Sequence, residues 1–228
     1  MTWPASLLAV VGLTPAMLDE WIPQLVNAAG GTLEMTALAF LIAIILGLGM
    51  ALARVSRAVW LSRAAMLYIE IVRGIPVLTL LFLIYFSLTS AGIVLDAFLA
   101  ASIGLGLNGA AYLAEVYRSG IEAVSAGQRE AAQSIGMRQR QAMRYIVLPQ
   151  AVPVVLPPLA NYAIALLKDT SIASLIAAPE IMLRANDLSS EYFMPMQIYV
   201  ITGIMYFSMA WPLSRAVRML EVRLGRRR

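Results

Sequence analysis

The sequence of 228 residues contains no cysteine and no histidine. These absences exclude disulfide bonds, thiol nucleophiles, imidazole general bases and the commonest transition-metal ligands. Charged residues are also scarce, at 13% of the chain, about half of their usual share in soluble domains, whereas hydrophobic residues reach 61%. The composition therefore predicts a membrane protein rather than an enzyme, with no metal and no other cofactor.

The net charge of +4 and the pI near 9.6 raise the question of nucleic-acid binding. The arginines, however, lie in three groups between apolar runs. The groups are Arg54, Arg57 and Arg63; Arg118, Arg129, Arg138, Arg140 and Arg144; and Arg215, Arg218, Arg223 and Arg226 to Arg228. This distribution is typical of membrane topology, so we expect a lipid bilayer and no nucleic acid as partner.

Five long apolar runs follow one another along the chain, at residues 32–53, 64–88, 97–117, 145–167 and 192–214. Each is close to the roughly 20 residues that a helix needs to cross a bilayer about 30 Å thick. The sequence therefore predicts an all-α integral membrane protein with about five transmembrane helices. It leaves no room for a second folded domain.

Positively charged loops concentrate on the cytoplasmic side of a membrane. Placing the three arginine groups there puts the N-terminus outside and the C-terminus in the cytoplasm. We predict an external lead-in at residues 1–28, a transmembrane domain at 29–220 and a basic cytoplasmic tail at 221–228. The longest cytoplasmic connection then lies at about residues 125–145, between the third and fourth spans.

This connection has the features of a helix pair that docks onto another protein. Ser125 is a suitable cap for a short helix, and Ala131 and Ala132 offer small side chains that another backbone can approach. Gly136 allows a bend, after which we expect a second helix to end at Pro149. The alternative is an ordinary amphipathic helix lying on the lipid surface.

Two nucleotide-binding sequence patterns bear on the function of this chain. Gly104, Gly106 and Gly109 satisfy G-x-G-x-x-G, but they lie inside a predicted span, where small residues favour close helix packing instead. The chain has no G-x-x-x-x-G-K-[ST] sequence. Any ATP hydrolysis must therefore come from a partner protein.

Several motifs of this sequence resemble one family of transport proteins. Glu130-Ala131-Ala132, then Gly136, then Ile146-x-Leu148-Pro149 resemble the cytoplasmic signature of permeases in binding-protein-dependent ABC importers. Tyr68-x-Glu70-x-x-Arg73-Gly74-x-Pro76, the run from Ala110 to Ile121 and Leu167-Lys168-Asp169-Thr170-Ser171-Ile172 resemble the polar-amino-acid branch, which carries histidine, arginine, glutamine, glutamate and opines. The resemblance covers about residues 33–218.

The resemblance implies a type I ABC importer permease in a bacterial inner membrane. Its expected partners are two cytoplasmic ATP-binding subunits, a second identical or similar permease, an external binding protein and the amino-acid substrate. The connection between spans three and four would be the coupling helix that contacts the ATPase. The implied coupling residues are Gln128, Glu130, Ala131, Ala132, Gly136, Leu148 and Pro149.

Polar groups inside predicted spans are the candidates for the substrate pathway, because they are costly in lipid. Asn108, Tyr112 and Glu115 share one helical face, with Asn108 near the midplane. Asn108 can alternatively form a helix-to-helix hydrogen bond, and Glu115 can pair with Arg73 or Arg118. The pathway candidates are Asn108, Tyr112, Glu115, Asp169, Lys168, Ser171 and Arg73.

Lys168, Asp169 and Ser171 follow a proline-rich span, a context in which irregular backbone lines protein or a watery cavity. Glu70 and Arg73 are three residues apart, and we expect them to neutralise each other. The acids Glu115 and Asp169 favour a cationic substrate, such as arginine, lysine, histidine or an opine, over glutamate.

Two functions of other classes remain open at this point. A self-sufficient secondary transporter or channel would need no ATPase. A membrane-embedded enzyme is less well supported, because the chain shows no convincing nucleophile and base pair.

Overall fold

The computed structural model describes residues 14–56 and 58–225, and all regular structure in these ranges is helical. Two π-helical segments and one 3-10 segment join or extend the α-helices. The elements are α2 (Pro15–Arg54), α3 (Val59–Gly74), α4 (Val77–Phe82), η1 (Leu83–Ser87), α5 (Leu88–Ser90), α6 (Ala97–Glu122), α7 (Ala126–Ser134), α8 (Gln139–Ala142), η2 (Met143–Val147), α9 (Leu148–Asp169), η3 (Thr170–Ile176), α10 (Ile181–Tyr192) and α11 (Pro195–Gly225).

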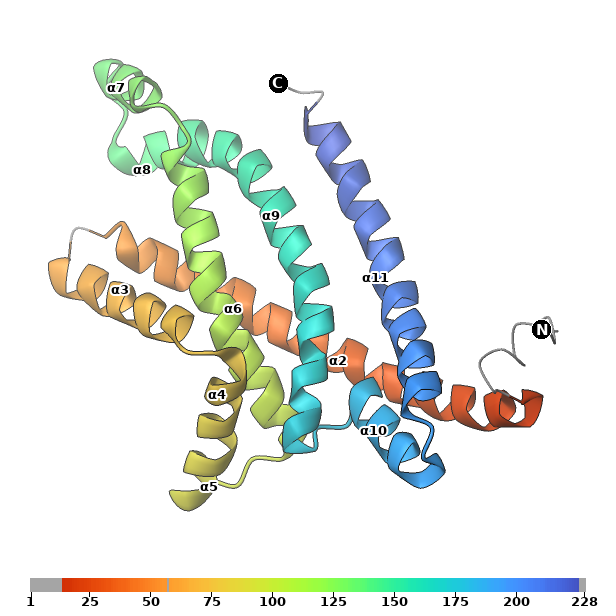
Figure 1. Cartoon of the computed structure of the whole chain (residues 1–228). Helices are drawn as coiled ribbons and strands as arrows, with labels where there is room; N and C mark the ends of the chain where they lie inside the picture. Colours follow the sequence, from red (N-terminus) through yellow and green to blue (C-terminus); the bar gives the residue numbers. More distant parts are fainter. Residues whose placement is uncertain (1–13, 57, 226–228) are drawn as a thin grey trace.

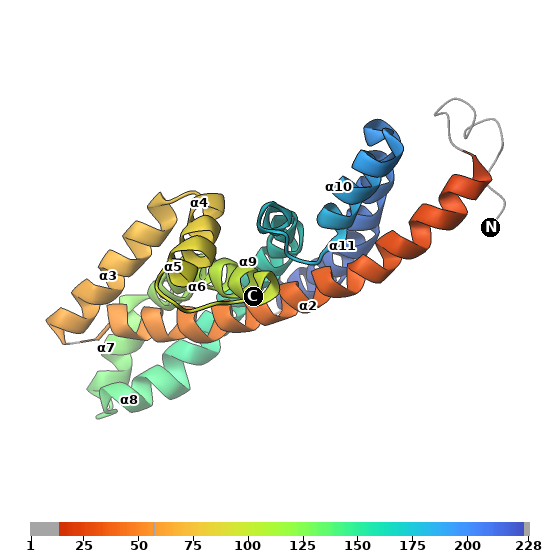
Figure 2. The ribbon, with the colours of Figure 1, turned by 90° about the horizontal axis from the view of Figure 1, so that it is seen from below.

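Helix α2 begins well before the first predicted span. Thr14 is its N-cap and accepts a hydrogen bond from the Met17 amide at 3.4 Å, and Pro15 occupies the first turn, where its missing N–H costs nothing. With 40 residues α2 is about 60 Å long at 1.5 Å per residue, twice the hydrocarbon thickness. It crosses α6, α9 and α11 obliquely, as both ribbon views show (Figures 1 and 2). The predicted lead-in is therefore helical from Pro15 onward, and its first 13 residues lie outside the described ranges.

The second predicted span is broken into two parts. Helices α3 and α4 meet at an angle of 109°. Pro76 supplies no N–H to the helix ladder, and Ile75 before it is extended, with φ −96° and ψ 132°. The prediction of one continuous helix over residues 64–88 is wrong, because the chain folds back at this proline.

The helix that follows Gly136 also differs from the expectation. It does not end at Pro149 but runs through to Ile176, over Gln139–Ile176. The turn just before Pro149 widens into the π-helical segment η2. Such a bulge accommodates a proline, which cannot bond to the carbonyl four residues earlier and would clash with it. The predicted helix end at Pro149 is therefore wrong.

Three described helices are long and apolar enough to cross a membrane, or up to four if the bent α3 and α4 pair is one span. These three are Pro15–Arg54, Ala97–Glu122 and Gln139–Ile176. The fifth predicted span, residues 192–214, lies mostly in α11, which has 31 residues but is less apolar than these three helices. The all-helical membrane fold is thus confirmed, and the number of five spans stays a prediction.

Small residues of α6 bring its neighbours close. A Cβ on Gly106 would lie 2.6 Å from the side chain of Ile42, and one on Gly109 would lie 2.6 Å from the Tyr162 hydroxyl. These glycines therefore serve helix packing, as predicted, and the dinucleotide motif they spell has no structural counterpart here. The main core around them is buried on all sides and includes Met35, Ala39, Leu81, Leu105 and Leu166.

A second cluster lies where α10 packs between the N-terminal half of α2 and the start of α11. Its largest fully buried side chains are Trp21, Leu25, Ile181, Leu188 and Ile198. The ribbon places α10 at the end of the bundle opposite α7 (Figure 1). The molecule thus carries one packed helical extension at each end.

Candidate functional site

Helix α7 has a well-defined C-terminal cap. Gly136 has φ +80°, the Gly136 amide donates to the Gln133 carbonyl at 2.9 Å, and the Met137 amide donates to the Ala132 carbonyl at 3.0 Å. This pair of bonds is the Schellman motif, whose left-handed position strongly favours glycine. Ser125 occupies the N-cap position, but its hydroxyl makes no capping hydrogen bond. Gly136 therefore sets the direction in which α7 leaves the bundle.

The predicted coupling residues do not all face the same way. Gln128, Glu130 and Ala131 are exposed on α7, whereas Ala132 is 3% exposed and packs inside the chain. Neighbouring residues on a helix point about 100° apart, so a partner that reaches Ala131 does not reach Ala132. Sequence analysis missed Ile135, which is 78% exposed beside Gly136. The sequence feature that could have indicated Ile135 is an apolar residue directly before the glycine that ends a polar helix.

The start of α9 lies next to the start of α7. Gln128 and Pro149 line the same cavity of about 730 Å³, together with Ser125 and, from the end of α11, Leu224. Leu148 is exposed and lies outside this lining. Arg129 fixes α7 to the end of α6 by donating to the Ile121 carbonyl at 2.7 Å. The structure thus brings part of the predicted coupling set together at one end of the molecule.

The polar face of α6 looks toward α9. Tyr112 stacks on Tyr162, with ring centroids 5.0 Å apart and 20° between the planes. Asn108 is half-buried and makes no hydrogen bond within the described residues. Tyr162 was missed by sequence analysis, because an aromatic residue in an apolar span carries no signal of its own. The two stacked tyrosines lie between α6 and α9. Asn108 lies one helical turn before Tyr112 on α6 and extends the polar strip along that helix.

Glu115 ends this strip and is already paired. Its carboxylate accepts two hydrogen bonds from Arg118, at 2.7 and 3.0 Å, and Arg118 also donates to Glu122 at 2.5 Å. The structure therefore selects Arg118, and not Arg73, as the partner of Glu115. This ion pair compensates the charge on which part of the cationic-substrate argument rested.

The residues at the end of α9 are placed differently from one another. Lys168 and Asp169 are exposed, and Asp169 forms no ion pair within the described part of the chain. The Ser171 hydroxyl donates to the Lys168 carbonyl at 2.7 Å, so it serves the local backbone. Of the two acids among the pathway candidates, Glu115 is therefore paired and Asp169 is not, within the described residues.

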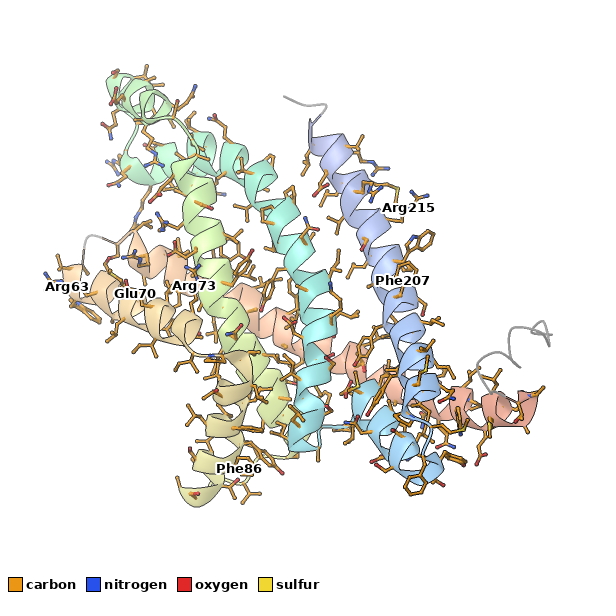
Figure 3. All side chains as sticks on the ribbon, in the orientation of Figure 1. Arg63, Glu70, Arg73, Phe86, Phe207 and Arg215 are labelled. Carbon is orange, nitrogen blue, oxygen red and sulfur yellow. The ribbon has the colours of Figure 1, made fainter. Side chains whose placement is uncertain are left out.

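Arg73 and Glu70 both project from α3 (Figure 3). They are exposed, and among the described residues no ion pair joins them. The expected mutual neutralisation is therefore wrong for this structure. Neither a hydrogen bond nor an ion pair links Arg73 to the polar strip within residues 14–56 and 58–225. The segment that contains Glu70 and Arg73 is instead joined to α6 by Tyr68, whose hydroxyl donates a hydrogen bond to the Leu107 carbonyl at 2.7 Å.

Comparison with known proteins places these features in a family. A model of the "Binding-protein-dependent transport system inner membrane component" family matches residues 39–226. The chain is 40% identical over 189 residues to the probable amino-acid ABC transporter permease protein YckA of Bacillus subtilis, covering 83% of this chain and 84% of that one. It is 35% identical over 216 residues to the octopine transport system permease protein OccM of Rhizobium radiobacter, covering 91% and 88%.

Solved structures agree with this placement. A crystal structure of an amino acid ABC transporter with histidines contains a chain that is 36% identical and superposes with a TM-score of 0.88, covering 92% of this chain and 99% of that one. A chain of the inward-facing MetNI methionine ABC transporter shares the fold, with a TM-score of 0.65. The predicted type I importer permease fold and the role of a membrane transport subunit are confirmed. The chain belongs to the binding-protein-dependent transport system inner membrane component family.

Proposed function

We propose that this chain is the permease subunit of an ATP-driven amino-acid importer and forms the translocation pathway with a second permease subunit. The names of the relatives support the substrate class, since they include amino-acid, glutamine, cystine and octopine permeases. Two cytoplasmic ATP-binding subunits and an external binding protein complete the proposed complex. ATP binding and hydrolysis would supply the free-energy difference between its inward and outward states.

The observation that carries this proposal is the shape of α7. It is a short helix at the end of the bundle, and its cap leaves Ile135 78% exposed at its C-terminal end. An apolar side chain in this position is stabilised by a protein surface that covers it. We assign α7 as the coupling helix and expect it to insert into a groove on the ATP-binding subunit.

A cross-linking experiment tests this assignment, because the chain has no cysteine of its own. Ile135→Cys labelled with a benzophenone maleimide is expected to capture the ATP-binding subunit in membranes of the source cells. Val94→Cys is the matched control, since Val94 is also 78% exposed but lies in the turn before α6. Failure of Ile135→Cys to capture an ATP-binding subunit, or equal capture at Val94→Cys, would refute the docking assignment.

The proposed orientation follows from the same end of the molecule. Leu224 near the C-terminus and Ser125 before α7 line one cavity, so α7 and the end of α11 lie on the same side of the membrane. A cytoplasmic α7 therefore implies a cytoplasmic C-terminus. The basic tail beyond it, Arg226 to Arg228, lies outside the described residues and would face anionic headgroups there.

We expect protease added to spheroplasts to leave a tag after Arg228 intact. The same tag inserted at Gly92, in the turn between α5 and α6, should be cleaved, because this turn lies at the other end of α6 from α7. Immunoblotting before and after permeabilisation measures both. Cleavage of the C-terminal tag in intact spheroplasts would reverse the proposed topology.

We further propose a polar substrate with a preference for cationic side chains. The support is Asp169, whose charge is unpaired in the described chain, whereas Glu115 is already bound to Arg118. A hydrogen bond to a charged group contributes about 1.5–3 kcal/mol, so Asp169→Asn should lower arginine uptake relative to glutamine about tenfold. Glu115→Gln is the comparison and should alter this ratio much less.

Uptake of arginine, histidine, glutamine and glutamate by the complete complex measures this preference. A wild-type preference for glutamate would contradict it. So would an unchanged ranking of the four substrates in Asp169→Asn.

A further inference from the structure

A groove opens between α2 and α10 at the end of the bundle opposite α7. Its volume is about 700 Å³, and its lining includes Gln24, Asn27, Glu34, Leu183, Arg184 and Asp187. Phe98, at the first turn of α6, closes one side. This groove, named here the α2–α10 groove, shares no lining residue with the polar strip of α6 and α9. It belongs to neither part of the site described above.

The α2 side of the groove is formed by one stripe of mostly polar residues. Gln24, Asn27, Gly31 and Glu34 follow one another at intervals of three, four and three residues, so they share one face. Glu34 is exposed and makes no hydrogen bond or ion pair within the described residues. A carboxylate and two amides on one face supply both hydrogen-bond acceptors and donors, which suits the binding of a polar ligand.

The α10 side supplies a cation next to these groups. Arg184 reaches across the groove and donates to the Gln24 side-chain oxygen. Its contact with Asp187 is long, at 3.5 Å, and Asp187 is more than half exposed. A guanidinium has five N–H donors in a planar fork, so Arg184 keeps donors for a further acceptor. The groove therefore holds one cation between two weakly engaged carboxylates.

The wall beneath these side chains is rigid. The Ile181 amide donates to the Thr32 hydroxyl at 3.1 Å, joining the start of α10 to α2. Glu180 is 1% exposed and accepts from the amides of Met182 and Leu183 at 2.8 and 2.7 Å, and also from the Tyr206 hydroxyl. Because Glu180 is fully used as the cap of α10, it holds the wall in place and leaves ligand binding to the other groups.

We propose that the α2–α10 groove binds a zwitterionic amino acid at the outer mouth of the permease. Arg184 would bind the α-carboxylate in the bidentate manner typical of guanidinium, with the amides of Gln24 and Asn27 as further donors. Glu34 and Asp187 would accept from the α-ammonium group. The volume is within the roughly 300–1,000 Å³ of small-molecule sites. The choice of an amino acid, rather than another zwitterion, rests on the proposed function.

Equilibrium binding of radiolabelled glutamine to the complete complex in nanodiscs, without binding protein, tests the proposal. Glu34→Gln and Arg184→Gln are each expected to weaken glutamine binding at one saturable class of sites, raising its Kd about tenfold or more. The reason is that each variant removes a hydrogen bond to a charged group. Glu191→Gln and Arg63→Gln are matched controls outside the groove and should bind like the wild type. Glu34 is exposed, so its variant keeps the test valid if Arg184→Gln fails to fold.

Competitors define the chemistry of the ligand. Glutaramic acid lacks the α-ammonium group and 4-aminobutanamide lacks the α-carboxylate, so both should compete poorly at the groove. Unchanged glutamine binding in both groove variants would overturn the proposal. It would also be overturned if these variants changed only the stimulation of ATPase activity by the binding protein, which would make the groove a protein contact.

The same preparation separates this proposal from the proposed function. ATP-driven uptake is measured after adding binding protein. If the wild type shows no uptake, the proposed importer function is contradicted, but the groove proposal is not. The loss of glutamine binding in Glu34→Gln relative to Glu191→Gln is read without ATP. It therefore decides the groove independently of transport.

Discussion

The variant Glu130→Lys is expected to abolish ATP-driven uptake while the permease still inserts into the membrane. Glu130 is exposed on α7, and the proposed coupling helix must seat its exposed side chains against the ATP-binding subunit. Loss of a central interface residue typically costs about 2 kcal/mol or more, which corresponds to a roughly 30-fold weaker complex. Reversal of its charge adds repulsion to that loss.

Uptake into proteoliposomes and co-purification of the ATP-binding subunit measure this effect together. Asp19→Lys is the control, because Asp19 is an exposed carboxylate near the start of α2, far from α7 in the fold. This control should transport and co-purify like the wild type. Normal uptake by Glu130→Lys would remove α7 from the coupling role.

Gly31→Ala is expected to destabilise the permease strongly, and Gly30→Ala is not. A Cβ at position 31 would lie 2.2 Å from the carbonyl oxygen of Pro179, and backbone cannot move aside as a flexible side chain can. Position 30 faces open space, with no heavy atom within 4 Å. Overpacking typically costs about 1–3 kcal/mol, whereas alanine in an open helical position stabilises by up to about 1 kcal/mol.

Thermal unfolding of the two variants in detergent compares these adjacent positions directly. The unfolding midpoint should fall by about 2–12 °C in Gly31→Ala, given roughly 2–4 °C per kcal/mol for a chain of this size. It should stay constant or rise in Gly30→Ala. Equal midpoints would show that α2 and the Pro179 turn do not approach this closely.

Composition and apolar runs were sufficient to predict a helical membrane protein, because burying about 20 apolar residues in lipid does not depend on tertiary detail. Proline effects were harder to predict. Pro76 interrupts the chain with a 109° bend, yet Pro153, Pro157 and Pro158 lie inside the continuous helix α9. The same residue type has opposite outcomes, since neighbouring helices decide whether a freed carbonyl finds another partner.

The candidate site, too, could be predicted from the sequence only in part. The pairing of Glu115 with Arg118 was among the alternatives, because residues three apart on a helix are neighbours. The α2–α10 groove was not predicted, since Gln24 and Arg184 are 160 residues apart in the chain. Tyr162 was also missed, because it becomes part of the polar strip only through its stacking on Tyr112. Local spacing makes a local pair possible but does not ensure it, since Glu70 and Arg73 have the same spacing and form no ion pair among the described residues. The fold alone supplies the long-range pairs.

The most direct test of the proposed importer is uptake into proteoliposomes that contain this permease, with or without the ATP-binding subunits and the binding protein. We predict amino-acid uptake that requires all of these components and ATP on the side of the membrane where α7 lies. Collapse of the ion gradients should leave this uptake unchanged. Uptake driven by an ion gradient with the permease alone would contradict the proposal and would favour a secondary transporter.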